Sequence, residues 1–236
     1  MLSFLFPSVC PLCGKNLLEK GHQICQSCST KEIFVKEPVC YSCGKPLNSS
    51  EKEFCRDCRK YPKNFRRGMG LCVYQEPVKG SLAAIKYKNK REFAEYYIKE
   101  AGKRKGRQLR ELGVDAIVPV PLHKKKQRKR GFNQAEIFAK GIGGIIGCRV
   151  EKNLVRRIVY TKPQKKLNKR ERKQNLMSAF SGNLKAYKKA GCPKKILVVD
   201  DIYTTGATVQ GVTNALLFMG VQEVYIFCIA VGTGFS

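Results

Sequence analysis

The sequence predicts a doubly wound parallel α/β sheet that follows a small cysteine-rich zinc-ribbon module. From Gly70 onward, short apolar runs alternate with segments of helical periodicity, and the first 60 residues hold eight of the twelve cysteines. Such alternation of strands and helices is typical of a parallel sheet covered by helices on both faces. We therefore expect two domains, a double zinc-ribbon module over residues 1–62 and an α/β domain over residues 63–236.

The eight N-terminal cysteines form four C-x2-C pairs, each separated from the next by eleven residues. A C-x2-C turn directs two thiolates at one ion, and two such turns complete a tetrahedral zinc shell. Two structural zinc ions are therefore expected, one held by Cys10, Cys13, Cys25 and Cys28 and the other by Cys40, Cys43, Cys55 and Cys58. Short hairpins favour this sequential pairing over a cross-braced one, which the spacing leaves open. Redox dithiols and an iron–sulfur cluster are the weaker alternatives.

The strands and helices of the second domain follow from apolar periodicity. Strands are expected over residues 71–74, 115–118, 195–199 and 224–231, and helices over 78–103 with a break near Lys88, over 133–146 and over 207–219. Gly220 is the expected residue just after the last helix, and Gly14 and Gly44 are expected at positive φ. Cys72 and Cys228 fall in strand segments and are expected to be buried.

The charge of the chain points to a polyanionic partner. Lysine and arginine number 46 against 18 aspartates and glutamates, a net charge of +28. Nucleic acid is the natural candidate, and solvated basic surfaces are the alternative. The longest apolar run, Val224 to Val231, is far shorter than the roughly 20 residues of a membrane span. The first residues carry no signal-peptide pattern, so we expect a cytoplasmic protein without a membrane span.

The segment from Ile196 to Thr208 is the most informative in the chain. Four apolar residues are followed by two aspartates and by a Thr-Thr-Gly-x-Thr loop that runs into a helix. Free backbone N–H groups, hydroxyl donors and a helix N-terminus suit a phosphate monoester. Adjacent carboxylates suit the vicinal hydroxyls of a sugar, or a cation beside them. A sugar phosphate satisfies both halves, whereas an ordinary strand–turn–helix capped by Asp201 leaves the combination unexplained.

This segment resembles the 5-phosphoribosyl-1-pyrophosphate (PRPP) signature of type I phosphoribosyltransferases along its whole length. The resemblance implies that Asp200 and Asp201 hold the ribose 2′- and 3′-hydroxyls, and that Mg²⁺ accompanies the pyrophosphate. It implies that the 5-phosphate is bound by Thr204, Thr205, Gly206, Ala207 and Thr208. Where Thr204 stands, 6-oxopurine salvage enzymes carry an aspartate, so salvage of hypoxanthine or guanine is not expected.

Two basic segments precede this loop in the sequence. The first, residues 124–130, comes after Val120, Pro121 and Leu122, which occupy the place of the pyrophosphate loop in type I enzymes. The second, residues 156–173, lies where those enzymes keep a flexible hood. Arg130, Arg156 and Arg170 are the expected pyrophosphate contacts. A single-strand nucleic-acid surface is expected from Lys124, Lys125, Lys126, Arg128, Lys129 and Phe132. The alternative is that Arg130, Arg156, Arg157 and Arg170 bind pyrophosphate alone and the other basic residues are solvated.

The order of motifs along the chain resembles that of the ComF/GntX family, which is associated with natural competence. Cysteine knuckles are followed by P-V-P-L, R-G-F-N-Q, T-x2-Q-x2-L-x2-R and the PRPP loop. The resemblance implies a PRPP-binding protein that acts on or with single-stranded DNA and with other competence proteins. Three functions stay open: a PRPP-binding protein that acts on or with single-stranded DNA and, if it catalyses, displaces pyrophosphate from the ribose C1; a non-catalytic PRPP sensor that controls DNA or partner binding; and a phosphoribosyltransferase for a small acceptor. No residue stands out as a general base.

Overall fold

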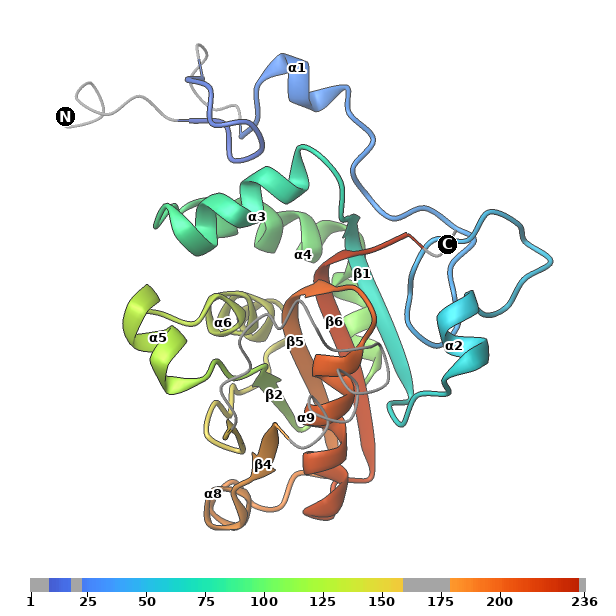
Figure 1. Cartoon of the computed structure of the whole chain (residues 1–236), viewed down its shortest axis with the longest axis vertical. Helices are drawn as coiled ribbons and strands as arrows, with labels where there is room; N and C mark the ends of the chain where they lie inside the picture. Colours follow the sequence, from blue (N-terminus) through green and yellow to red (C-terminus); the bar gives the residue numbers. More distant parts are fainter. Residues whose placement is uncertain (1–8, 18–22, 159–178, 234–236) are drawn as a thin grey trace, which may run out of the picture.

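The computed structural model describes residues 9–17, 23–158 and 179–233, and its centre is a four-stranded parallel sheet (Figure 1). The strands lie in the order β1-β6-β5-β2, and all three neighbouring pairs are parallel. Their bounds are β1 Arg67–Val73, β2 Ala116–Pro119, β5 Lys195–Tyr203 and β6 Glu223–Val231. A separate antiparallel pair is made by β3 Val155–Arg157 and β4 Phe180–Gly182.

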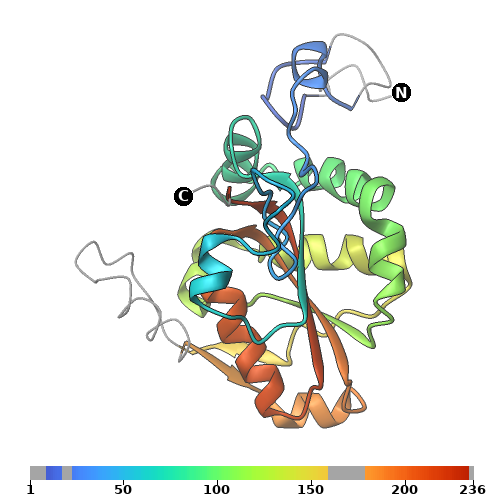
Figure 2. The same ribbon diagram turned by 90° about the vertical axis from the view of Figure 1, so that its right-hand side faces the viewer.

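Helices cover both faces of this sheet (Figure 2). The helices are α1 Gln26–Ser29, α2 Arg56–Lys60, α3 Val78–Tyr87, α4 Phe93–Glu111, α5 Lys124–Arg130, α6 Gln134–Ile146, α8 Leu184–Lys189 and α9 Ala207–Phe218. Successive side chains of a strand face opposite sides. Leu197 and Val199 accordingly belong to the core under α4 and α6, and Ile196 and Val198 to the core under α9. The predicted doubly wound α/β arrangement is confirmed.

The structure extends the predicted elements at three places. Strand β5 continues to Tyr203, so both aspartates lie in the strand rather than after it. The basic run after Leu122 forms the helix α5, which the sequence did not predict, and α8 was also not predicted. Gly220 follows α9 with φ +102° as expected, and the buried positions of Cys72 and Cys228 are confirmed.

The N-terminal cysteines form two four-cysteine clusters with sequential pairing. In each cluster the four Sγ atoms lie within 4.8 Å of one another, which matches a tetrahedral Cys₄ zinc shell and rules out the cross-braced arrangement. No disulfide joins any of the twelve cysteines. Gly14 and Gly44 have φ of +75° and +73°, as predicted for the tight turn after the second cysteine.

The two ribbons pack on the two different cores. We call residues 9–17 and 23–33 the first ribbon and residues 38–60 the second ribbon. Cys10 and Cys28 join the core under α4, whereas Cys40 and Cys58 join the core under α9. Figure 1 shows α1 beyond the outer side of α3, and Figure 2 shows α2 beside α9. The domain boundary at residue 62 stays a prediction. No helix among the described residues is long and apolar enough to cross a membrane.

Candidate functional site

The predicted site lies at the carboxyl end of the sheet, where β2 and β5 run side by side. Beyond the end of β2, the N–H of Val120 still donates to Val199 O at 2.9 Å, so the predicted pyrophosphate loop starts beside the acidic pair. Asp200 and Asp201 are only 7% and 4% exposed. Two adjacent carboxylates buried to this extent need cations or hydrogen-bond donors around them.

Asp201 has its partners within the described chain. Lys86, near the carboxyl end of α3, forms an ion pair with its carboxylate, and Gln134 Nε2 donates to Asp201 Oδ1 at 3.2 Å. The Asp201 N–H in turn donates to Asp200 Oδ1 at 2.9 Å. Burial and then the charge of Asp201 raise the pKa of Asp200 well above its usual value, and the Lys86 ammonium opposes this. The pair is therefore held together by contacts that stabilise Asp201 more than Asp200.

Three further cations surround these carboxylates. Burial lowers the pKa of Lys126, and the charges of Arg157, Arg130 and Lys86 lower it further, which places these groups close together. Burial also lowers the pKa of Arg157, whereas the nearby Asp200 charge raises it. Four cationic side chains thus converge beside two carboxylates. A cluster of four cations beside two carboxylates is suited to a multiply charged anion.

The predicted phosphate loop, residues 204–208, runs into the N-terminus of α9. Gly206 is the N-cap of α9 in the left-handed region, with φ +78°, and no side chain caps this helix. The first-turn N–H groups of α9 are therefore available to a ligand. Thr204 and Thr205 are exposed, and Ala207 and Thr208 are half-buried. The loop presents hydroxyls and backbone donors to the same side as the carboxyl end of β5.

The R-G-F-N-Q motif joins the pyrophosphate loop to the acidic pair. Gly131 ends α5 with φ +80°, and Asn133 is the N-cap of α6, accepting from the N–H of Ala135 at 3.1 Å. Asn133 Nδ2 also donates to Val120 O at 3.0 Å, which fixes the start of the loop. Gln134 then bonds both Arg130 and Asp201. The motif therefore connects the predicted pyrophosphate half of the site to the ribose half.

Some predicted residues lie away from this cluster. Arg156 is exposed and pairs with Ser181 across β3 and β4, and its side chain faces opposite to that of Arg157. Lys124, Lys125, Arg128 and Lys129 are exposed along α5, whereas Pro121 and Leu122 are half-buried. Phe132 is half-buried, with the Arg91 guanidinium 4.2 Å from its ring centroid. Arg170 lies outside the described residues.

Three residues of the site were not among the predicted contacts: Lys86, Lys126 in its role beside the carboxylates, and Gln134. Lys86 looks like one exposed lysine among many in a helix with apolar periodicity. Its position becomes clear only when α3 is placed over the sheet. Gln134 does stand within a motif, but no pattern in the sequence indicates that its amide reaches a residue 67 positions away.

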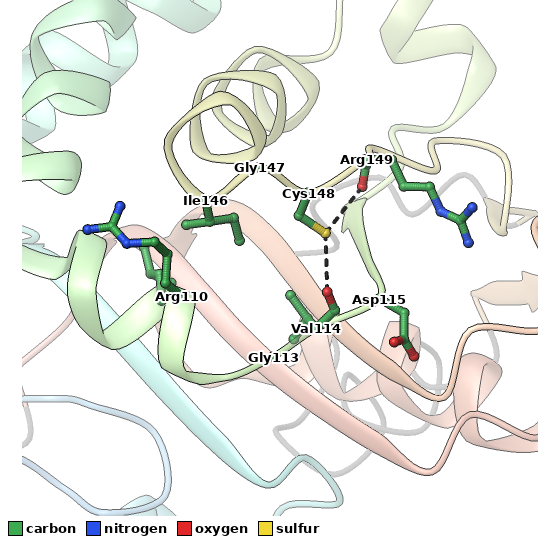
Figure 3. Close-up of a pocket in the computed structure, with 9 residues that line it drawn as sticks. Arg110, Gly113, Val114, Asp115, Ile146, Gly147, Cys148 and Arg149 are labelled. Carbon is green, nitrogen blue, oxygen red and sulfur yellow. Dashed lines mark hydrogen bonds between the residues drawn. The ribbon is translucent and has the colours of Figure 1, made fainter.

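A cavity of about 380 Å³ lies at the opposite end of β2 (Figure 3). It is lined by Leu109, Arg110, Gly113, Val114, Asp115, Ile146, Gly147, Cys148 and Arg149, none of them a predicted site residue. Its polar groups are already bonded within the protein: Asp115 accepts from the N–H groups of Lys194 and Lys195, and Arg110 donates to Ile145 O. Burial raises the pKa of Cys148, so its thiol stays protonated.

Comparison with known proteins gives two kinds of similarity. Residues 1–59 match the family model of a double zinc ribbon domain. Over 116 residues the chain is 34% identical to competence protein F of Haemophilus influenzae, which covers 49% of this chain and half of that protein. It is 28% identical over 179 residues to the DNA utilization protein YhgH of Escherichia coli, covering 73% of this chain and 75% of that protein.

A third relative covers nearly the whole chain. Competence protein ComFC of Bacillus subtilis is 25% identical over 212 residues, which is 90% of this chain and 72% of that protein. A purine phosphoribosyltransferase from Pyrococcus horikoshii matches 58% of this chain and 73% of its own with a TM-score of 0.35 and 20% identity. The sequence similarities and the double zinc ribbon confirm the resemblance to the ComF/GntX family, since the chain is similar to proteins named for competence and DNA utilisation.

Proposed function

We propose that this chain binds PRPP at the carboxyl end of β5 and couples that binding to the handling of single-stranded DNA. The observation that carries the proposal is a buried pair of carboxylates placed between an uncapped helix N-terminus and four converging cations. Sugar hydroxyls are matched by the carboxylates, the 5-phosphate by residues 204–208, and a pyrophosphate by the cations.

The chain offers separate groups for each part of PRPP. Asp200 and Asp201 would orient the ribose diol, and Arg130, Lys126 and Arg157 would neutralise the pyrophosphate beside the loop of Val120, Pro121 and Leu122. Arg156 and Arg170 remain candidates for the hood. The carboxylate oxygens suit the oxygen coordination that Mg²⁺ prefers, and bound Mg²⁺ would supply further neutralisation of pyrophosphate charge.

If the protein is a phosphoribosyltransferase, the bond between ribose C1 and the pyrophosphate oxygen breaks and a bond from C1 to the acceptor forms. The cations beside the predicted pyrophosphate loop would stabilise the charge that develops on the leaving group. Lys86 and Gln134 would hold Asp201 oriented. No described side chain near C1 is an evident general base, so a non-catalytic PRPP sensor is the second candidate.

The first experiment measures PRPP binding by calorimetry in the presence of Mg²⁺. Asp200→Ala with Asp201→Ala should lower the affinity at least about tenfold, because hydrogen bonds to charged groups contribute roughly 1.5–3 kcal/mol each. Glu111→Ala is the control, since Glu111 is exposed on α4 and pairs only with Arg107 among its described contacts. Unchanged affinity in the double variant would show that PRPP does not use the acidic pair.

Release of pyrophosphate separates the enzyme from the sensor. Wild-type protein is incubated with PRPP and Mg²⁺, with and without single-stranded DNA or small acceptors. Acceptor-dependent release supports transfer, and binding of PRPP without release under all these conditions supports the sensor.

The relatives' names, competence protein and DNA utilization protein, support a role for DNA. The helix α5 supports direct contact, because six of its seven residues are lysine or arginine and most are exposed. Backbone contacts of this kind make the logarithm of affinity fall with the logarithm of salt concentration, by about 0.7 per phosphate neutralised on single strands.

A triple variant tests this contact. Changing Lys124, Lys125 and Lys129 to Gln should flatten the salt slope by up to about two units if all three contact phosphates. The matched control changes the exposed Lys185, Lys188 and Lys189 of α8, at the other end of the sheet, to Gln. Equal slopes in the two triple variants would exclude α5 as the DNA surface.

A further inference from the structure

Tyr203 lies between the second ribbon and the predicted phosphate loop, and it contacts both. This tyrosine ends β5, directly before the Thr-Thr-Gly loop, and it is 3% exposed. Its ring does not face solvent but belongs to the same apolar cluster as the four cysteines of the second ribbon.

Gly206 rests against this ring. A Cβ placed on Gly206 would lie 2.3 Å from the Tyr203 hydroxyl oxygen and 2.6 Å from the ring carbon that bears it. The N-cap of α9 therefore follows the position of the tyrosine. The hydroxyl itself is buried and has no hydrogen-bond partner among the described residues, so packing alone fixes it.

The tyrosine is contacted by Lys45 of the second ribbon and by Phe65 of the segment that follows the ribbon. The ring of Phe65 meets it edge-on, with centroids 6.5 Å apart. Lys45, which is buried beside Asp57 with a 3.0 Å ion pair, places its ammonium 5.8 Å from the Tyr203 centroid. Lys45 follows Gly44 in the zinc-binding turn, so its position depends on the fold of that turn.

The segment that leaves the second ribbon also contacts the loop and α9. Lys63 Nζ donates to Thr205 O at 3.4 Å. The N–H of Asn64 donates to Gln210 Oε1 at 3.2 Å, and Asn64 Nδ2 donates to Asn214 Oδ1 at 2.8 Å. These contacts reach the loop and the first two turns of α9, where the 5-phosphate is expected.

We propose that the second zinc ribbon is a positioning part of the phosphate site: its metal-held fold keeps Tyr203, and through it Gly206 and the N-terminus of α9, in the phosphate-binding conformation. The first ribbon has no described contact with residues 203–210. The expected change in PRPP affinity rests on the proposed function. The expected change in the loop's conformation does not depend on PRPP binding.

The experiment compares Cys55→Ser with Cys25→Ser in the full-length chain. Both cysteines open the second pair of their ribbon and precede a short helix, so the two variants are matched. Each should retain one zinc by elemental analysis. Cys55→Ser should lower PRPP affinity about tenfold or more, because small displacements of positioned groups are costly, whereas Cys25→Ser should stay within about twofold. Equal affinities in the two variants would overturn the proposal.

Amide hydrogen exchange gives a readout that does not depend on PRPP. Exchange of the amides of residues 204–210 should accelerate in Cys55→Ser and not in Cys25→Ser. If wild-type protein binds no PRPP, the proposed function fails, while this exchange pattern still decides whether the ribbon holds the loop. Unchanged exchange in both variants would overturn the proposal on its own.

A milder pair of variants covers the case in which Cys55→Ser does not fold. Phe65→Leu keeps the cysteines and removes the edge contact with Tyr203. Phe54→Leu is its control, because Phe54 lies on the second ribbon, is 39% exposed and contacts Tyr41 instead of Tyr203. With two zinc ions retained in both, Phe65→Leu should lower PRPP affinity severalfold and raise loop exchange. Identical behaviour of the two phenylalanine variants would contradict the proposed positioning role.

Discussion

The two ribbons have the same cysteine spacing but different surroundings. In the first ribbon Cys13 is exposed, and a Cβ on Gly14 would meet nothing within 4 Å. In the second ribbon all four cysteines are buried, and a Cβ on Gly44 would lie 2.6 Å from Gly68 O. Local spacing is therefore enough to build a metal site, whereas the role of that site depends on what the fold packs against it.

The largest expected difference between the ribbons is in stability. Cys40→Ser and Cys10→Ser should each reduce the zinc content from two ions to one. Because metal binding energy is folding energy, Cys40→Ser should destabilise the α/β domain by about 4 kcal/mol or more. Cys10→Ser should unfold its own ribbon and change the stability of that domain by about 1 kcal/mol or less. Denaturant unfolding followed by elemental analysis measures both quantities, and equal losses would remove the distinction.

The two turn glycines give a finer comparison. Gly14→Ala should cost about 1–2 kcal/mol, since an alanine at positive φ is strained. Gly44→Ala carries the same strain and also forces its Cβ against the backbone of β1, so its total cost should reach about 3 kcal/mol. The measurement is thermal or denaturant unfolding of both variants. A cost for Gly44→Ala no larger than that for Gly14→Ala would mean that the ribbon moves away from β1 easily.

The lysines that follow these glycines should differ by less. Lys45 is 4% exposed and bonds Asp57, whose side chain is 46% exposed, whereas Lys15 is exposed. Lys45→Met should cost about 1–2 kcal/mol, because Asp57 keeps part of its hydration after losing its partner. Lys15→Met should stay within about 0.5 kcal/mol of wild type. Chemical denaturation of the two methionine variants tests whether the burial of Lys45 is energetically relevant.

The acidic pair provides a check that does not involve zinc. Burial and Asp201 raise the pKa of Asp200 in the folded protein, so the folded state holds its proton more tightly than the unfolded state. As the pH rises from the pKa of Asp200 in the unfolded state to its pKa in the folded state, the free energy of unfolding therefore decreases. Asp200→Asn removes this dependence, so its melting temperature should exceed that of wild type at pH 8 by more than at pH 4. Zinc content should not change, and a gain that grows toward acid would contradict the assignment.

The sequence predicted the parts of this molecule that short-range chemistry determines. The C-x2-C spacing predicted both four-cysteine clusters and the positive φ of Gly14 and Gly44. Apolar runs gave all four strands of the central sheet, and the Asp-Asp-x-x-Thr-Thr-Gly pattern placed a loop at a helix N-terminus. These features depend on neighbours within a few residues, so a single sequence contains them.

What the sequence could not predict depends on distant residues. The helix α5 was not predicted, because six like charges in seven residues show no apolar periodicity. Which of the adjacent residues Arg156 and Arg157 faces the acidic pair depends on the register of β3 with β4. Lys86 and Phe65 acquire their partners only through the folded sheet. Periodicity and spacing carry no information about such contacts.

The helix α5 has a consequence for how salt acts on this protein. Its like charges face one another at i and i+4, as Lys124 and Arg128 do, and its first turn holds cations beside the positive end of the helix dipole. Dissolved ions screen that repulsion, so added salt should order the isolated helix while it weakens any attraction to a polyanion. Bound single-stranded DNA would neutralise the cations of α5 in the same way as dissolved ions do when no DNA is present. A salt slope measured on DNA binding would contain both processes and would undercount the phosphates in contact.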